Sequence, residues 1–147
     1  MQAEGYFLPF TGPLLQSLAV RPLGLIMDGS TVGRGCLTLM VSVVYQQRAL
    51  PIAWLVVKGR KGHFPEDTHL ALLEQVHALI PAGAQVVFLG DGEFDGVQLQ
   101  GTVDAYGWRY VSRTAKNIVL GQGDKEFGFE SVGVQAGELI SLPAVTL

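Results

Sequence analysis

The chain has 147 residues, of which 48% are hydrophobic and 16% are charged, and its formal net charge is −3. This length suits one ordinary domain with its own core, and the composition excludes both a disordered chain and a coiled coil. The negative net charge argues against a compact nucleic-acid binder that relies on overall positive charge. The mean hydropathy of +0.32 is high, which indicates strands buried on both faces or a piece of a larger protein.

The first 21 residues form an apolar lead-in that lacks the features of a secretory signal. They have no basic segment at the start, carry Glu4, and are broken by Pro9 and Pro13. No apolar run approaches the roughly 18 residues that span a bilayer. The single cysteine, Cys36, cannot form an internal disulfide or a thiolate zinc site. We therefore predict a cytoplasmic protein with no membrane partner.

Three β-rich segments follow the lead-in. Residues 23–28, "LGLIMD", form a short apolar run that ends at Asp28, and the glycines of "GSTVGRG" then supply a turn. Residues 36–47 are rich in β-branched and aromatic side chains, and residues 51–58 form another such run. Because the link between the second and third segments is short, we predict three strands in an antiparallel meander.

The period of the apolar residues changes after residue 63. Residues 63–83 have acidic residues near the start, a proline near the end and apolar residues at a three-to-four spacing, which predicts a helix. The apolar positions of this helix are Leu70, Leu73, Val76 and Ile80. Residues 84–91 read as an apolar strand, residues 96–108 as a second helix and residues 109–116 as a fifth strand. The order β-β-β-α-β-α-β predicts an α/β fold in which helices cover a mixed sheet.

The end of the chain differs in character. Residues 118–147 are rich in glycine and carry short alternating runs, which predicts small antiparallel hairpins. We therefore divide the chain into a lead-in (1–21), an α/β core (22–117) and a β-rich segment (118–147). Because Leu147 lies within an apolar stretch with no closing helix, we expect a piece of a longer protein.

Two aspartates stand where apolar strands are predicted to end. Asp28 and Asp91 each precede a glycine, in "LIMDGS" and "FLGDGE". In open α/β sheets, sites form beyond the carboxyl ends of strands, and two nearby carboxylates need a cation or a shared proton. Magnesium prefers one or two carboxylates together with water and phosphate oxygens, so the pattern indicates a Mg²⁺ or Mn²⁺ site. The alternative is that both aspartates cap turns, since Asp-Gly is a common turn dipeptide.

The residues after Asp91 have further interpretations. Asp91, Glu93, Asp95 and Gly96 match the opening of an EF-hand calcium loop. The match fails further on, because the twelfth position is Thr102 and the preceding segment is β-like. Glu93 is a candidate either for tuning the metal or for capping the following helix. For Asp95, directly before Gly96, we expect capping.

The segment from "LIMDGSTVGRG" to "LALLEQV", followed by "VVFLGDGEFDG", resembles the catalytic core of bacterial insertion-sequence transposases of the DDE class, whose fold is ribonuclease-H-like. The resemblance covers roughly residues 22–116, and 62 residues separate Asp28 from Asp91. It implies that Asp28 is the aspartate of the central first strand and Asp91 the one at the end of the fourth. In this family the two aspartates and a later glutamate hold two metal ions for in-line attack on a DNA phosphodiester.

The chain departs from the family in its second half. The family's glutamate lies on a helix well after the fifth strand, in a Tyr, Arg, Glu, Lys pattern, and we predict no such helix here. Glu126, Glu130 and Glu138 fall in the glycine-rich tail, which resembles the start of the family's β-rich insertion, so none of them is assigned as the third ligand. The upstream DNA-binding region is also missing. The resemblance therefore implies a partial transposase domain, inactive alone, that when complete forms a homodimer and acts on DNA in the bacterial cytoplasm.

Basic residues supply candidate DNA contacts. Lys58, Arg60 and Lys61 form the densest basic cluster, and Arg109 and Arg113 share one face of the predicted fifth strand. We assign Lys58, Arg60, Lys61 and Arg113 as candidates for contact with phosphates. A solvated loop and an ordinary strand edge explain these residues equally well.

Other chemically distinctive residues favour structural roles. His63, His69 and His77 lack the spacing of a helical zinc site, so we expect surface histidines. Cys36 is expected to be a small buried residue, and the two tryptophans are expected to pack in the core. Two further hypotheses for the whole chain stay open. One is a non-catalytic remnant whose aspartates only cap turns, and the other is a ribonuclease-H-like nuclease that shares the aspartates and differs in substrate.

Overall fold

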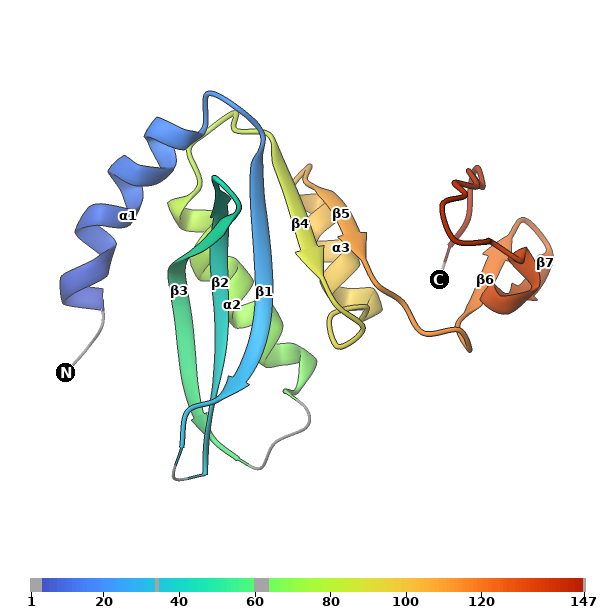
Figure 1. The fold of residues 1–147 in the computed structure, drawn as a ribbon, viewed down its shortest axis with the longest axis horizontal. Coiled ribbons are helices and arrows are strands. Elements are labelled where there is room, and N and C mark those ends of the chain that lie inside the picture. Colours follow the sequence, from blue (N-terminus) through green and yellow to red (C-terminus); the bar gives the residue numbers. More distant parts are fainter. Residues whose placement is uncertain (1–3, 34, 60–63, 147) are drawn as a thin grey trace. The chain divides into compact units, whose positions relative to one another are not determined.

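The computed structural model describes residues 4–33, 35–59 and 64–146 (Figure 1). These residues form a mixed α/β structure with a five-stranded mixed sheet, which confirms the predicted fold class at that level. The helices are α1 (Glu4–Leu18), α2 (Glu66–Leu79), α3 (Val97–Ala105) and the short 3-10 helix η1 (Phe129–Val132). The strands are β1 (Leu23–Thr31), β2 (Cys36–Tyr45), β3 (Arg48–Lys58), β4 (Val86–Gly90), β5 (Arg109–Ser112), β6 (Val119–Gln122) and β7 (Lys125–Gly128).

The chain forms two compact units, residues 1–112 and residues 113–147. The first unit contains α1 to α3 and the five-stranded sheet, and the second contains β6, β7 and η1. In the second unit β6 and β7 pair antiparallel, and Thr146 forms a bridge back to Gly121. A small antiparallel hairpin is what the short alternating runs of this segment predict.

The five strands of the first unit lie in the order β3-β2-β1-β4-β5. β1 pairs antiparallel with β2, and β2 with β3, whereas β4 runs parallel to both β1 and β5. The first three strands thus form one half of a larger mixed sheet. The pairing of β2 with β3 is irregular between Val41 and Ser42. Gln46 and Gln47 join β2 to β3 with positive φ angles of 46° and 62°, as a type I′ hairpin turn requires.

β1 extends beyond the predicted end of the first strand. The apolar run stops at Asp28, but the backbone stays paired with β2 as far as Thr31 opposite Leu37. The parallel pairing with β4 stops earlier, at Ile26 opposite Leu89. Backbone hydrogen bonds to a hairpin partner do not depend on apolar side chains, so the polar end of this strand was not visible in the hydropathy pattern.

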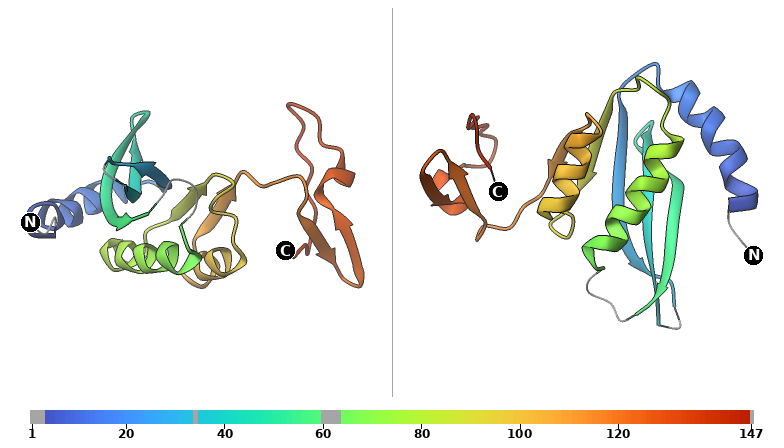
Figure 2. Two further views of the ribbon diagram at one scale, coloured as in Figure 1. Left: turned by 90° about the horizontal axis from the view of Figure 1, so that it is seen from below. Right: turned by 180° about the vertical axis from the view of Figure 1, so that it is seen from behind.

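α2 and α3 cover the same face of the sheet (Figure 2). The predicted helix after residue 63 is confirmed as α2, although its fully buried stripe differs from the predicted one. The buried residues of α2 are His69, Leu72, Leu73 and Val76. They pack with Leu99 and Val103 of α3 and with the alternate side chains of β1, β2 and β4 that point to this face.

The N-terminal lead-in contains a helix that the sequence analysis did not predict. α1 includes both Pro9 and Pro13, which had suggested a broken segment. Leu15 of this helix is fully buried in the core, and α1 contacts α2 and β3. Tertiary packing of this apolar face offsets the hydrogen bonds that the prolines remove. None of the described helices combines the length and the apolar character that a membrane span needs.

Candidate functional site

Asp28 and Asp91 occupy equivalent places in neighbouring parallel strands. The parallel ladder ends at Ile26 opposite Leu89, and each aspartate lies two residues further along its own chain segment. Asp28 is still within β1, whereas Asp91 directly follows the last residue of β4. Both side chains are exposed. The register therefore brings both residues to the carboxyl end of the β1–β4 pair.

Asp28 belongs to the face of the sheet that α2 and α3 leave uncovered. Side chains two residues apart in a strand share a face, so Asp28 shares its face with Ile26, which is paired with Leu89. Asp91 comes two residues after Leu89, just beyond the end of β4. The face of Asp28 is opposite α2 and α3, because the alternate residues Leu25 and Met27 are buried beneath those helices. The Asp28 carboxylate is consequently presented to solvent rather than to the core.

The backbone after β4 is held in a tight turn that orients Asp91. Its Oδ1 accepts a hydrogen bond from the Glu93 N–H at 2.9 Å, and its carbonyl oxygen accepts one from the Phe94 N–H at 3.0 Å. Phe94 is almost fully buried, and a Cβ on Gly90 would lie 2.8 Å from the Phe94 Cβ. Glycine is therefore needed at position 90 for Phe94 to fold back under the turn.

Glu93 ties this turn to the segment before α2. Its Oε1 accepts a hydrogen bond from the Phe64 N–H at 3.1 Å. Its Oε2 lies beside β1, 3.7 Å from the place where a Cβ on Gly29 would be. The Phe64 ring is closer still, since its Cε2 would be 2.9 Å from that Cβ. Gly29, next to Asp28, thus leaves room for both side chains.

The helix that follows the turn is capped by a residue that the sequence analysis missed. α3 begins after Gly96, which offers no capping side chain, and Glu66 Oε1 accepts the Leu99 N–H at 3.0 Å instead. A Cβ on Gly96 would lie 2.2 Å from this oxygen. The expectation that Asp95 caps α3 is therefore wrong, because the carboxylate of Glu66 fills the position of a cap side chain. No local signal in the sequence indicates this cap, because Glu66 and Leu99 are 33 residues apart.

β5 supports the turn from the other side. The Tyr110 hydroxyl donates a hydrogen bond to the carbonyl oxygen of Phe94, and the Tyr110 ring stacks on Phe88 of β4. Burial raises the pKa of Tyr110 above its ordinary value, the hydrogen bond with Ser112 lowers it, and the negative charge of Asp95 raises it. The turn of residues 91–95 is thus held by two distant segments, through the Tyr110 hydroxyl at Phe94 and the Phe64 N–H at Glu93.

The described histidines do not behave as one class. His69 is buried with an exposed fraction of 3%, and its ring lies edge-on to Phe94 with centroids 4.9 Å apart, so the expectation of a surface histidine is wrong there. His77 is exposed and stacks on Tyr106 with centroids 3.7 Å apart. His63 lies outside the described residues. Cys36 is the first residue of β2 and is only half-buried, so it is less buried than expected.

The candidate DNA contacts are only partly within the described residues. Lys58 is the exposed last residue of β3, and Arg60 and Lys61 lie outside the part of the chain that is described. Arg113 is exposed, but β5 ends one residue before it and Arg113 belongs to the second unit. The expectation that Arg109 and Arg113 share a strand face is therefore wrong. The four-residue β5 is paired over its whole length with β4, whose last residue is Gly90, so the strand stops with its partner.

The residues near the two aspartates fit a hydrated divalent ion better than a closed metal cage. Across residues 4–33, 35–59 and 64–146, no group of three or more His, Cys, Asp or Glu side chains is placed to hold a metal. Two carboxylates nevertheless satisfy magnesium, which keeps several water ligands and takes up phosphate oxygens. The Glu93 N–H donates a hydrogen bond to Oδ1 of Asp91, and the other oxygen of Asp91, Oδ2, retains its lone pairs for a cation.

The sheet face that carries Asp28 has both polar side chains, such as Thr38 and Arg109, and apolar ones. Met40 of β2 lies directly opposite Asp28, and Trp54 of β3 lies opposite Met40. Val56 and Val111 on this face are 57% and 55% exposed. α2 and α3 pack on the other face of the sheet (Figure 2), so Asp28 shares an uncovered face with these partly exposed side chains.

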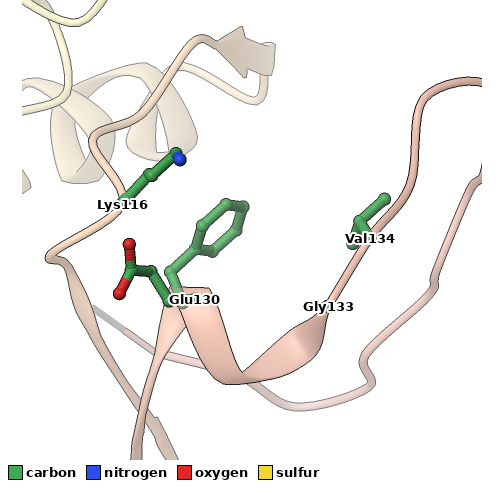
Figure 3. Close-up of a pocket in the computed structure, with 5 residues that line it drawn as sticks. Lys116, Glu130, Gly133 and Val134 are labelled. Atoms are coloured by element: carbon green, nitrogen blue, oxygen red, sulfur yellow. The ribbon is translucent and has the colours of Figure 1, made fainter.

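The second unit has a cavity of its own, of about 410 Å³, at η1. Figure 3 shows Lys116 and Glu130 at one end of the cavity and Val134 at the other. Phe129 and Gly133 complete its lining. All five lining residues belong to residues 113–147, so the cavity shares no residue with the candidate site of Asp28 and Asp91.

No model of a known protein family matches the chain, and no curated protein matches it significantly in sequence. The resemblance quoted above and the geometry around Asp28 and Asp91 are therefore the basis for a proposal of function.

Proposed function

We propose that the chain is part of the catalytic domain of a DDE-class transposase with a ribonuclease-H-like fold, and that Asp28 and Asp91 bind Mg²⁺ or Mn²⁺. One observation carries the proposal. The two aspartates named by the resemblance each lie two residues beyond the last pair of the parallel β1–β4 ladder, and both are exposed. The strand order β3-β2-β1-β4-β5, with only β2 antiparallel to its neighbours, supports the ribonuclease-H-like arrangement.

The chemistry of the proposed site follows from its charges. Asp28, Asp91, Glu93 and Asp95 bring four carboxyl groups to the end of the β1–β4 pair, and such a cluster repels DNA phosphates unless a cation is bound. Asp28 and Asp91 would each give a carboxylate oxygen to the cation. When bound, the metal would activate a water or 3′-hydroxyl nucleophile and neutralise charge on the phosphate. The complete site of two ions would take a third carboxylate, which the resemblance assigns to a later helix.

We further propose that the complete protein binds DNA and forms a homodimer. Lys58, Arg60, Lys61 and Arg113 would contact DNA phosphates, whose charge they would neutralise in a salt-dependent manner. In the complete protein we expect a homodimer that holds the transposon ends. A ribonuclease-H-like nuclease would use the same two aspartates and would differ in its substrate.

A second candidate is a non-catalytic remnant of such a domain. The hydrogen bond from the Glu93 N–H to Asp91 Oδ1 favours it, because this contact is the one that an aspartate makes when it only stabilises a turn. In that case Asp28 and Asp91 would have no common ligand. The two candidates therefore differ in whether the carboxylates bind one cation together.

A titration of the whole chain with Mn²⁺ tests the proposal. Paramagnetic broadening or calorimetry would be recorded for the wild type, Asp28→Asn and Asp91→Asn, with Asp104→Asn as a control at an exposed aspartate of α3. We expect saturable binding that each of the first two substitutions weakens by at least about tenfold and that Asp104→Asn leaves unchanged. Binding that persists in Asp91→Asn would contradict the proposed site, and no binding in the wild type would favour the remnant.

A further inference from the structure

We propose that Glu93 is a positioning residue for the Asp91 carboxylate. The inference rests on the proposed function, because it assigns Glu93 a task at the metal site of Asp28 and Asp91. It goes beyond that function by naming a residue outside the pair of aspartates and a segment, at Phe64, through which the site is held. Glu93 acts through hydrogen bonds to its neighbours and is not itself assigned as a ligand.

The first contact comes from the backbone of Glu93. Its N–H donates to Asp91 Oδ1 at 2.9 Å, which fixes one oxygen of Asp91 and thereby the plane of the carboxyl group. A carboxylate at a strand end with free rotation about its side-chain bonds loses this freedom on binding a cation. Fixing the group in advance removes part of that cost.

The second contact comes from the side chain of Glu93. Its Oε1 accepts the Phe64 N–H at 3.1 Å, so residue 93 is anchored to a segment 29 positions away in the chain. Phe64 itself is buried, with an exposed fraction of 3%. The anchor is therefore attached to the core of the first unit rather than to a loose loop, and the position of the Glu93 N–H is held with it.

The third contact connects the same anchor to the other aspartate. The Phe64 ring and Glu93 Oε2 both lie over Gly29, the residue after Asp28. One glutamate thus contacts Asp91 through its backbone and approaches the Asp28 segment with its side chain. Residues that orient metal ligands in this way commonly change metal affinity by 10- to 100-fold when they are removed.

The charge of Glu93 is not needed for this task, since the Phe64 N–H requires only an acceptor. Glu93→Gln retains an amide oxygen for this hydrogen bond, whereas Glu93→Ala removes it. Glu66 is the matched control elsewhere in the unit. It is also a half-buried glutamate that accepts a backbone N–H, from Leu99 at 3.0 Å, and this hydrogen bond caps α3.

The experiment measures the Mn²⁺ dissociation constant and the thermal stability of Glu93→Ala, Glu93→Gln and Glu66→Ala in the whole chain. We expect Glu93→Ala to weaken Mn²⁺ binding by about tenfold, measured well below its unfolding temperature. Glu93→Gln should keep most of the wild-type affinity. Glu66→Ala should lower the unfolding temperature about as much as Glu93→Ala does, but it should leave the Mn²⁺ dissociation constant unchanged.

Either of two outcomes overturns the inference. If Glu93→Ala binds Mn²⁺ as tightly as the wild type, Glu93 has no positioning role. If Glu93→Gln loses as much affinity as Glu93→Ala, the charge of Glu93 acts directly and the anchor to Phe64 does not. If Glu93→Ala does not fold, Glu93→Asp, which is too short to reach the Phe64 N–H, takes its place with the same expectation. Failure of the proposed function looks different, because binding would then be absent in the wild type or unaffected by Asp28→Asn and Asp91→Asn.

Discussion

The cap that Glu66 provides for α3 makes a sharp prediction about stability. Glu66→Ala removes the acceptor of the Leu99 N–H and leaves the N-terminus of α3 without a side-chain cap. Loss of a cap costs about 1 kcal/mol, and loss of the negative charge at the start of α2 adds about 0.5 kcal/mol. In a unit of this size each kcal/mol lowers the unfolding temperature by about 4 °C. We therefore expect a decrease of about 6 °C.

The effect of Gly96→Ser on stability is expected to change sign with the residue at position 66. In the wild type, Gly96→Ser places a Cβ 2.2 Å from Glu66 Oε1, so the carboxylate must leave and stability falls. In Glu66→Ala the space is empty, and the φ and ψ of −61° and 140° at residue 96 suit a serine cap. Gly96→Ser should then recover about 1 kcal/mol by accepting the Leu99 N–H itself.

Thermal unfolding followed by tryptophan fluorescence is the appropriate assay. The protein has two tryptophans, Trp54 and Trp108, and both belong to the first unit. Asp67→Ala is the matched control, because Asp67 is also in the first turn of α2 and is exposed. It should cost only about 0.5 kcal/mol. Additive effects of Glu66→Ala and Gly96→Ser, or equal losses in Glu66→Ala and Asp67→Ala, would refute the capping role of Glu66.

Two further predictions concern packing and pH. Gly29→Ala should destabilise the first unit by about 1–3 kcal/mol, since its Cβ would be 2.9 Å from Phe64 Cε2. Gly101→Ala, whose Cβ would meet nothing within 4 Å inside α3, should instead stabilise it by about 1 kcal/mol. Denaturant titrations check both, and a stabilising Gly29→Ala would contradict the close packing over β1. Burial raises the pKa of Tyr110 above its ordinary value of 10.0, so the folded protein holds the Tyr110 proton more tightly than the unfolded chain does. The free energy of unfolding is therefore expected to decrease as the pH rises past about 10. Tyr110→Phe should reduce this loss, as should Tyr106→Phe, whose pKa is raised by burial and by Glu74. Unchanged alkaline unfolding curves in both variants would exclude the two tyrosines as its cause.

Much of the secondary structure could be predicted because it depends on neighbours in the chain. The apolar runs and the three-to-four spacing after residue 63 correspond to β4 and α2, because burial of one face imposes a period on the sequence. The tight turn after Gly90 was also foreseeable from the Asp-Gly pair. α1 was not foreseeable, since Pro9 and Pro13 argue against a helix locally and only the burial of Leu15 in the core favours one.

The sequence by itself determined the α/β class, the two aspartates at the ends of apolar runs and the glycines that flank them. Tertiary structure decided that Asp28 and Asp91 both follow the last pair of the β1–β4 ladder, that Glu66 caps α3, and that Glu93 is anchored at Phe64. The physical reason is separation along the chain. The hydrogen bonds of Glu66 and Glu93 span 33 and 29 residues, so no local period records them, and they exist only after the sheet and its two covering helices have assembled.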